Sequence, residues 1–149
     1  MSLVAELLPL CNVLADLEVG SKQALLEKLG ELFESGNPQL AHAKVTESLA
    51  TREKLGSTAM GHSIAIPHGR IKGLREAVGA FVRLKTPLPF DAPDGRPVSL
   101  VFVLLVPQQA TDLHLLILGE LAELFSEKSL RDALHTAPDA AALHRLLAS

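Results

Sequence analysis

Apolar residues follow helical spacing near both ends of the chain and form continuous runs in its middle. In residues 22–35, leucines and a phenylalanine recur every three or four positions, which predicts an amphipathic helix. Ser21 before it is a favoured N-cap, and Gly36 after it is a typical helix-ending residue. Asn37-Pro38 predicts that a second helix restarts at once and runs to about Ala50. The two helices are expected to form a hairpin.

Short strands and loops are expected next to this hairpin. Residues 3–19 predict a turn followed by an edge strand. The glycine- and serine-bearing segment 51–62 predicts a surface loop. A short strand is expected over 63–66, and Pro67 ends it in a tight corner.

The strongest strand signal lies in the second half of the chain. Residues 98–106 are apolar at nearly every position, which predicts a strand buried on both faces. Residues 77–84 predict the strand before it, and Asp94-Gly95 predicts a turn between the two.

Helices are expected to close the chain. Thr111 is expected to cap a helix whose apolar stripe reaches Phe125. A short helix should then start at Ser126 or Ser129 and reach His135, and a last helix should open at 137–139. These elements predict one α/β domain over residues 1–149, with a central sheet covered by helices and a strand order that the pattern leaves open.

Composition narrows the possible functions. The chain has 149 residues, is 48% apolar and 21% charged, and contains no Trp or Tyr. Its net charge of −3 and its lack of stacking aromatic residues argue against nucleic-acid binding. Cys11 is the single cysteine, so no intrachain disulfide is possible and a cytoplasmic setting is expected. The N-terminus does not resemble a signal peptide, and the apolar runs are too short to predict membrane insertion.

The segment around His68 has the composition of a reactive site. Pro67 fixes the direction of the chain before the imidazole, and Gly69 removes side-chain bulk after it, so that another molecule could approach. The backbone N–H groups of Gly69 and Arg70 could cradle an anion, and Arg52 and Arg70 offer guanidinium donors for phosphate. A neutral imidazole is a competent nucleophile, so these parts suit a phosphorylated histidine. The pattern alone favours the alternative, a structural histidine in a tight turn.

The other histidines differ in how strongly the sequence supports a functional role for them. His114 is expected in the first turn of a helix, where anions are favoured and where a neutral imidazole could donate to a phosphoryl oxygen. The pattern alone favours the alternative, a residue near the helix N-terminus that has no function. A metal site of His62, His68 and His114 with Asp112 is disfavoured, because no histidine pair has helical i,i+4 ligand spacing. Three histidines on predicted helices are expected to be ordinary surface or half-buried side chains: His42, His135 and His144. No nucleotide-binding glycine motif and no serine-hydrolase elbow is present.

These motifs resemble those of a known family. The chain is similar to the enzyme IIA domains of the phosphotransferase system, of the mannitol/fructose type, and within that type to the nitrogen-regulatory IIA proteins. The specific part is Arg52-Glu53-x-x-Gly56-Ser57-Thr58 followed by Ile66-Pro67-His68-Gly69, and the likeness extends from about residue 12 to about residue 147. Further agreement lies in four short segments: 77–79, 90–92, 104–107 and Leu113-His114.

The resemblance implies a fold and a chemistry. A mixed, partly parallel sheet between helical layers is expected. His68 is expected to accept a phosphoryl group from a histidine-phosphorylated carrier protein, itself charged from phosphoenolpyruvate. Arg52 and His114 match the family's active-site arginine and second histidine, and phosphate-binding support is expected from Gly69, Arg70, Ser57 and Thr58. No cofactor, no metal and no directly bound small-molecule substrate is implied.

The resemblance also leaves alternatives open. A lone IIA domain favours a regulatory protein whose phosphorylation state is recognised by target proteins. The alternatives are a sugar-specific IIA that passes its phosphoryl group to a separate IIB, and a binding module that never turns over. The carrier is expected to make a small, transient, apolar contact around Ile66. His62 departs from the residue expected of relatives and is left outside the site.

Overall fold

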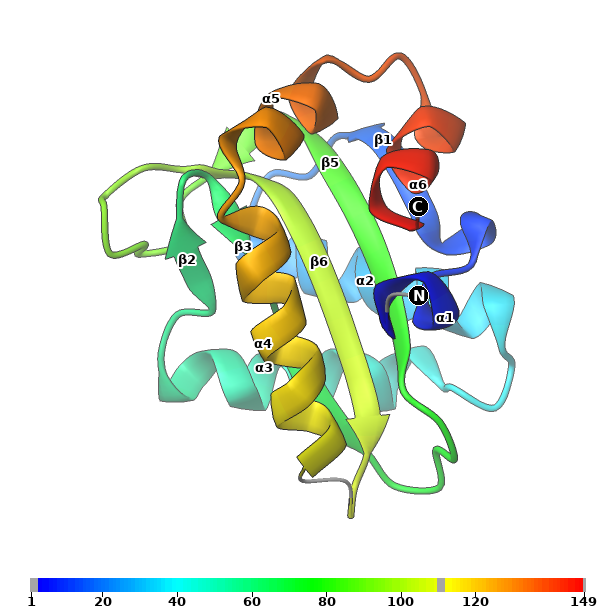
Figure 1. Cartoon of the computed structure of the whole chain (residues 1–149). Coiled ribbons are helices and arrows are strands. Elements are labelled where there is room, and N and C mark those ends of the chain that lie inside the picture. The colour runs from blue at the N-terminus through cyan, green and yellow to red at the C-terminus, as the bar shows by residue number, and fades with distance from the viewer. Residues whose placement is uncertain (1–2, 110–111, 149) are drawn as a thin grey trace.

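A mixed six-stranded sheet lies between two layers of helices in the computed structural model, which describes residues 3–109 and 112–148 (Figure 1). The first half of the chain forms α1 Leu3–Leu7, η1 Leu10–Asn12, β1 Val13–Leu17, α2 Lys22–Gly36, α3 His42–Leu55, β2 Ala59–Gly61, β3 Ile64–Ala65 and β4 His68–Ile71. The second half forms β5 Val78–Leu88, β6 Val98–Pro107, α4 Asp112–Phe125, α5 Lys128–Thr136 and α6 Ala140–Ala148. The α/β architecture with a central mixed sheet is therefore confirmed.

Strand β6 is the centre of the sheet. The strand order is β1-β5-β6-β3-β2, and β4 pairs with β6 as well. Parallel pairs are β1 with β5, β3 with β6 and β4 with β6, whereas β5–β6 and β2–β3 are antiparallel. β6 is buried along almost its whole length because it has neighbours on both edges and helices on both faces, as its continuous apolar run predicted. The expected edge strand is β1.

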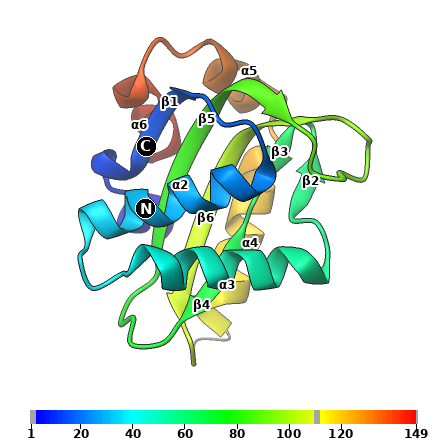
Figure 2. The ribbon, with the colours of Figure 1, turned by 180° about the vertical axis from the view of Figure 1, so that it is seen from behind.

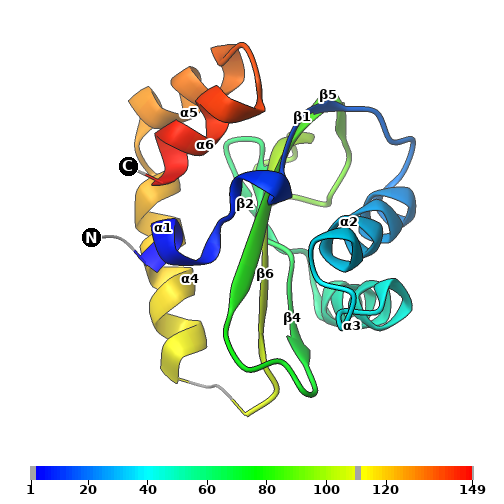
Figure 3. The same cartoon turned by 90° about the vertical axis from the view of Figure 1, so that its right-hand side faces the viewer.

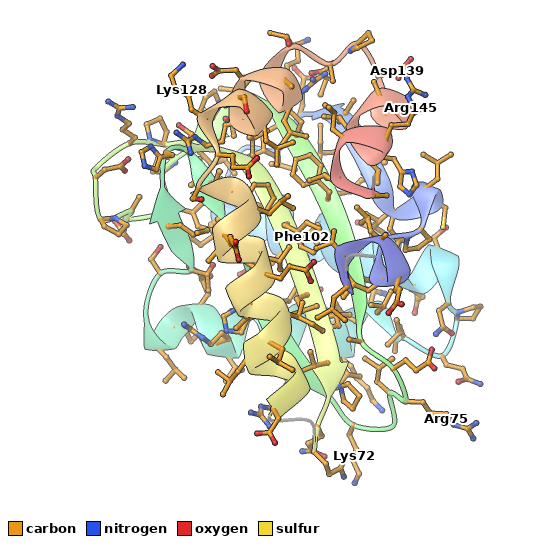
Figure 4. The ribbon with its side chains drawn as sticks, viewed as in Figure 1. Lys72, Arg75, Phe102, Lys128, Asp139 and Arg145 are labelled. Carbon is orange, nitrogen blue, oxygen red and sulfur yellow. The ribbon has the colours of Figure 1, made fainter. Side chains whose placement is uncertain are left out.

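The helices form two separate layers. Helices α2 and α3 cover one face of the sheet, and α1, α4, α5 and α6 cover the other (Figure 3). Figure 2 shows α2 and α3 crossing their face side by side. On the other face lies Phe102 of β6 (Figure 4). Its ring packs with those of Phe81 and Phe125, and the ring centroids are 6.2–6.4 Å apart. Each face thus has its own apolar core.

The α2–α3 hairpin departs from prediction at its turn. Ser21 caps α2 as expected, because its hydroxyl accepts a hydrogen bond from the Ala24 N–H at 3.0 Å. The predicted restart at Asn37 is wrong, since α3 begins only at His42. The Asn37 side chain accepts from the Gln39 N–H at 3.1 Å, which closes a local turn instead of a helix.

Helix α3 also ends later than predicted. It continues to Leu55, and β2 occupies Ala59–Gly61, so only residues 56–58 and 62 of the expected loop 51–62 lie outside helix and strand. Glu53, within the last turn of α3, bonds to Thr58 and so joins the helix end to the segment leading into β2. The extension places Arg52 on helix α3, so the packing of this helix on the sheet sets the position of the Arg52 backbone.

The chain around Pro67 is a broken strand rather than a tight corner. Both β3 and β4 pair with β6, and the Pro67 carbonyl accepts from the Leu104 N–H at 3.0 Å between them. Pro67 itself has no N–H to donate, which interrupts the ladder. The expectation of a turn at His68 is therefore wrong, because His68 is the first residue of β4.

The remaining elements follow the prediction closely. The strand expected over 77–84 is longer and reaches Leu88, and the turn near Asp94-Gly95 is closed by a bond from the Gly95 N–H to the Ala92 carbonyl. The three closing helices are present. The predicted cap Thr111 lies outside the described residues.

Candidate active site

The first strand residue after the break, His68, has one ring nitrogen fixed by the backbone. Its Nδ1 lies 2.9 Å from the carbonyl oxygen of Ile66. A carbonyl can only accept, so Nδ1 carries the proton and donates it. In a neutral ring the lone pair is therefore on Nε2.

Arg52 contacts that second nitrogen. From the last turn of α3, its Nε–H donates to His68 Nε2 at 3.2 Å. Its Nη1–H donates to the Gly56 carbonyl at 2.9 Å, which holds the guanidinium in one orientation. Arg52 thus marks Nε2 as an acceptor and places a fixed positive charge beside it.

The surroundings of His68 keep its ring neutral. Burial is the main cause that lowers its pKa below the ordinary 6.5, because a charged ring loses hydration there. The bond to the Ile66 carbonyl opposes this effect, the Arg52 charge adds to it, and the Glu53 charge opposes it. The balance favours the neutral, nucleophilic form near pH 7.

His114 faces His68 from the first turn of α4. The two ring centroids are 5.2 Å apart and the rings are inclined by 72°. Burial lowers the pKa of His114 first, and the nearby His68, Arg70 and Arg52 lower it further. A second imidazole, whose neutral form is also favoured, therefore lies beside the first.

These side chains line one groove. It has a volume of about 540 Å³ and runs between α3, β4 and the start of α4. His68, Arg52, His114, Gly69 and Arg70 all line it, so five of the seven predicted site residues meet there. Lys44 and Lys72 add positive charge to its walls. A larger hollow of about 780 Å³, between the N-terminal segment and the β4–β5 connection, contains none of the predicted residues.

Gly69 has a different use from the one expected. A Cβ added there would lie 2.3 Å from the Ser48 hydroxyl oxygen, so the space is filled by α3 rather than open to another molecule. The Ser48 hydroxyl donates to the Arg70 carbonyl at 3.0 Å and so anchors α3 on β4. Arg70 donates through Nη1 to the Gln108 carbonyl at 3.0 Å, which joins β4 to the segment after β6.

The hydroxyls of Ser57 and Thr58 are engaged away from the groove. The Ser57 hydroxyl donates to the Phe90 carbonyl, and the Thr58 hydroxyl donates to Glu53 Oε1 at 2.6 Å. Both hydroxyls therefore stabilise the local chain conformation. Sequence reasoning did not single out Glu53, Ser48 or the Ile66 carbonyl, although Glu53 lies inside the matched motif. Their contacts depend on α3 packing against β4, which no local pattern reveals.

The described residues contain no group of three or more His, Cys, Asp or Glu side chains that could hold a metal ion. Across these same parts of the chain, no helix has the length and apolar character needed to cross a membrane.

Comparisons with known proteins identify the class. The family model described as "Phosphoenolpyruvate-dependent sugar phosphotransferase system, EIIA 2" matches residues 6–149. The nitrogen regulatory protein of Pseudomonas aeruginosa is 43% identical over 128 residues, which are 86% of this chain and 83% of that protein. The crystal structure of the nitrogen regulatory protein IIA-Ntr from Neisseria meningitidis matches with a TM-score of 0.91 and 50% identity, over 98% of this chain and 99% of that one.

A more distant structure shares the fold. The mannitol enzyme IIA of Escherichia coli, solved in complex with phosphorylated enzyme IIB, has a TM-score of 0.77 at 21% identity, over 95% of this chain and 99% of that one. This likeness shows the fold alone. The family match over residues 6–149, by contrast, identifies the chain as a component of a phosphotransferase system. The chain belongs to the EIIA type-2 family of the phosphotransferase system, and its relatives at 40–43% identity include several nitrogen regulatory proteins.

Proposed function

We propose that this protein accepts a phosphoryl group on His68 from a phosphohistidine carrier protein and acts as a nitrogen-regulatory signalling protein. The observation that carries the proposal is the pair of bonds on the His68 ring. Nδ1–H is fixed on the Ile66 carbonyl, and the Nε2 lone pair faces Arg52. Membership of the family, with nitrogen regulatory proteins among the relatives, supports the regulatory part.

The reaction needs a neutral ring and one free lone pair. His68 Nε2 attacks the phosphorus held on the donor's histidine, and a new N–P bond forms as the donor's N–P bond breaks. The electron pair of the breaking bond returns to the donor's ring nitrogen. The proton stays on Nδ1 and remains hydrogen-bonded to the Ile66 carbonyl throughout, so this carbonyl stabilises the positive charge that develops on the His68 ring.

The groove supplies the charge that phosphoryl transfer requires. The transition state is loose, and its negative charge is spread over three equatorial oxygens. As Nε2 bonds to phosphorus, the Arg52 Nε–H can pass from the ring nitrogen to one of these oxygens, while Nη1 stays on Gly56. A neutral His114 on α4 can donate a ring N–H to another of these oxygens. Positioning and electrostatics thus carry the reaction.

A partner must dock over the groove to bring its phosphohistidine to His68. The expected apolar contact around Ile66 does not fit the structure, because Ile66 is only 5% exposed. Exposed leucines stand instead at the end of α3 and the start of α4, where Leu55 is 81%, Leu115 69% and Leu116 64% exposed. We assign the carrier's contact to these leucines.

The test is phosphorylation in a reconstituted relay. The protein is incubated with phosphoenolpyruvate, enzyme I and the carrier, and its intact mass is recorded. We expect the gain of one phosphoryl group, lost in His68→Ala. No gain in the wild-type protein would refute phosphoryl acceptance, and a gain that persists in His68→Ala would assign it to another residue.

The same sample decides between the regulatory and sugar-transport roles. Phosphorylated protein is mixed with purified mannitol- and fructose-type IIB proteins, and the phosphoryl group is followed by mass. A regulator is expected to retain it. Rapid transfer to a IIB would assign the protein to sugar transport.

A further inference from the structure

The carboxylate of Glu53, one residue after Arg52, joins three segments of the chain. The side chain is only 6% exposed and accepts from Lys22 Nζ of α2 at 3.0 Å. It also accepts from the Thr58 backbone N–H at 3.1 Å and from the Thr58 hydroxyl at 2.6 Å. A carboxylate withdrawn from water needs such replacement of its hydration. Glu53 therefore ties α2, the end of α3 and the segment before β2 to one point.

This point lies at the start of a chain of contacts that ends on His68. Glu53 fixes Thr58, and the neighbouring Ser57 hydroxyl accepts from the Ala59 N–H at 3.1 Å while donating to Phe90. Both contacts hold the segment that directly follows Gly56. The Gly56 carbonyl in turn accepts from Arg52 Nη1 at 2.9 Å.

Arg52 depends on that carbonyl for its orientation. Its side chain is long and flexible, and a guanidinium contributes to catalysis only when it is held in place. With Nη1 fixed on Gly56, Nε points to His68 Nε2 at 3.2 Å. Movement of the 56–58 segment would therefore move the guanidinium away from the reacting nitrogen.

We propose that Glu53 is a positioning residue for phosphoryl acceptance, which acts on Arg52 through Thr58 and the Gly56 carbonyl. The inference rests on the proposed phosphorylation of His68. Glu53 touches neither the ring nor the incoming phosphoryl group. If Glu53 served only to stabilise the fold through Lys22, its loss would have the same effect with or without Arg52. If it positions Arg52, its loss should slow acceptance only when Arg52 is present.

A double-mutant cycle separates these two roles. The rate of phosphoryl acceptance from the phosphorylated carrier is measured for Glu53→Gln, Arg52→Ala and the double variant, with Glu31→Gln as control. Glu31 is exposed on α2, so its replacement removes the same charge without touching the network. We expect Glu53→Gln to slow acceptance about tenfold or more, and Glu31→Gln to leave it unchanged. In the Arg52→Ala background, Glu53→Gln should slow acceptance by less than about twofold.

Two results would overturn the proposal: a wild-type rate in Glu53→Gln, or an equal slowing in the presence and absence of Arg52. Urea unfolding checks that each variant is folded. If Glu53→Gln does not fold, Thr58→Val replaces it in the cycle, because it removes the hydroxyl donor and keeps the backbone N–H bond.

A second readout does not require phosphorylation. In the unphosphorylated protein, the ¹⁵N chemical shift of His68 Nε2 reports whether a donor is bonded to it. We expect this shift to move toward that of a free acceptor nitrogen in Glu53→Gln and not in Glu31→Gln. An unchanged shift would refute the positioning role, whereas a failed wild-type phosphorylation with a changed shift would refute only the proposed function.

Discussion

At the scale of single residues, two hydrogen bonds fix the tautomer and the orientation of the His68 ring. The Ile66 carbonyl selects the tautomer, and Arg52 meets the nitrogen that is left with the lone pair. Burial lowers the pKa of His68, which keeps this lone pair free of a proton. Each of these features can be tested by itself.

The lowered pKa predicts how the site responds to acid. A base whose pKa is lowered by folding gains its proton only at a pH below the ordinary value of 6.5. His68 should therefore be more than half neutral at pH 6.5 and should reach half-protonation only at a lower pH. An NMR titration of the unphosphorylated protein checks this through the His68 ring resonances. A midpoint at or above 6.5 would contradict the account.

Arg52 should matter for rate and not for folding. Arg52→Ala removes both the donor to His68 Nε2 and the positive charge beside that nitrogen, so phosphoryl acceptance should slow about 10²-fold or more. Stopped reactions analysed by mass give the rate. Lys54→Ala removes an exposed cation from the same helix turn and serves as the control, with no slowing expected. Equal rates in Arg52→Ala and wild type would exclude the arginine from the site.

At the scale of elements, the site is made by helix α3 lying close against strand β4. Ser48 of α3 bonds to the Arg70 carbonyl, and Gly69 leaves the room that Ser48 needs. This contact sets the distance between the helix that carries Arg52 and the strand that carries His68. Gly69 is thus required by packing between two elements.

Gly69→Ala should disturb this contact. The added Cβ would lie 2.3 Å from the Ser48 hydroxyl oxygen and 3.2 Å from its Cβ, so the hydroxyl must rotate away from the Arg70 carbonyl or the helix must shift outward. We expect the free energy of unfolding to fall by about 1–3 kcal/mol, measured by urea denaturation, and acceptance to slow. Ser48→Ala in the same chain removes the closest clash and should restore part of the loss. Full stability of Gly69→Ala alone would show that α3 is not held as described.

Sequence reasoning succeeded for long apolar patterns and failed for short contacts. The stripe of α2 and the continuous run of β6 carry enough periodic signal to predict their type. Strand β2 has only three residues and no alternation of apolar and polar positions, so its sequence does not predict a strand. The start of α3 was predicted wrongly because Asn37 closes a turn as readily as it caps a helix. The pairing of Arg52 with His68 depends on tertiary packing, so only the family motif could suggest it.

At the scale of the whole molecule, the site and a second polar centre lie at different levels of β6. Arg83 of β5 pairs with Leu100 of β6, whereas His68 pairs with Leu104. Arg83 donates to the carbonyls of Leu134 and Ala137 at 3.0 and 2.7 Å, and to the Asp16 carboxylate. It therefore joins the sheet to the α5–α6 connection without contact with the groove.

Arg83→Met should separate stability from function. Asp16 has a side chain 59% exposed and can be hydrated when Arg83 is lost, so the main cost is the two buried carbonyls without donors. We expect a loss of about 1–3 kcal/mol in the free energy of unfolding, measured in urea. Phosphoryl acceptance by the folded variant should keep its wild-type rate. A slowed reaction in fully folded protein would reveal coupling between the two centres.

The most direct test of the central claim is the identity of the phosphorylated nitrogen. Protein labelled with ¹⁵N is phosphorylated by the carrier, and its histidine ring nitrogens are observed by NMR. The account predicts a phosphorus–nitrogen coupling on Nε2 of His68, with Nδ1 still protonated against the Ile66 carbonyl. A phosphoryl group on Nδ1, or on any residue other than His68, would contradict it.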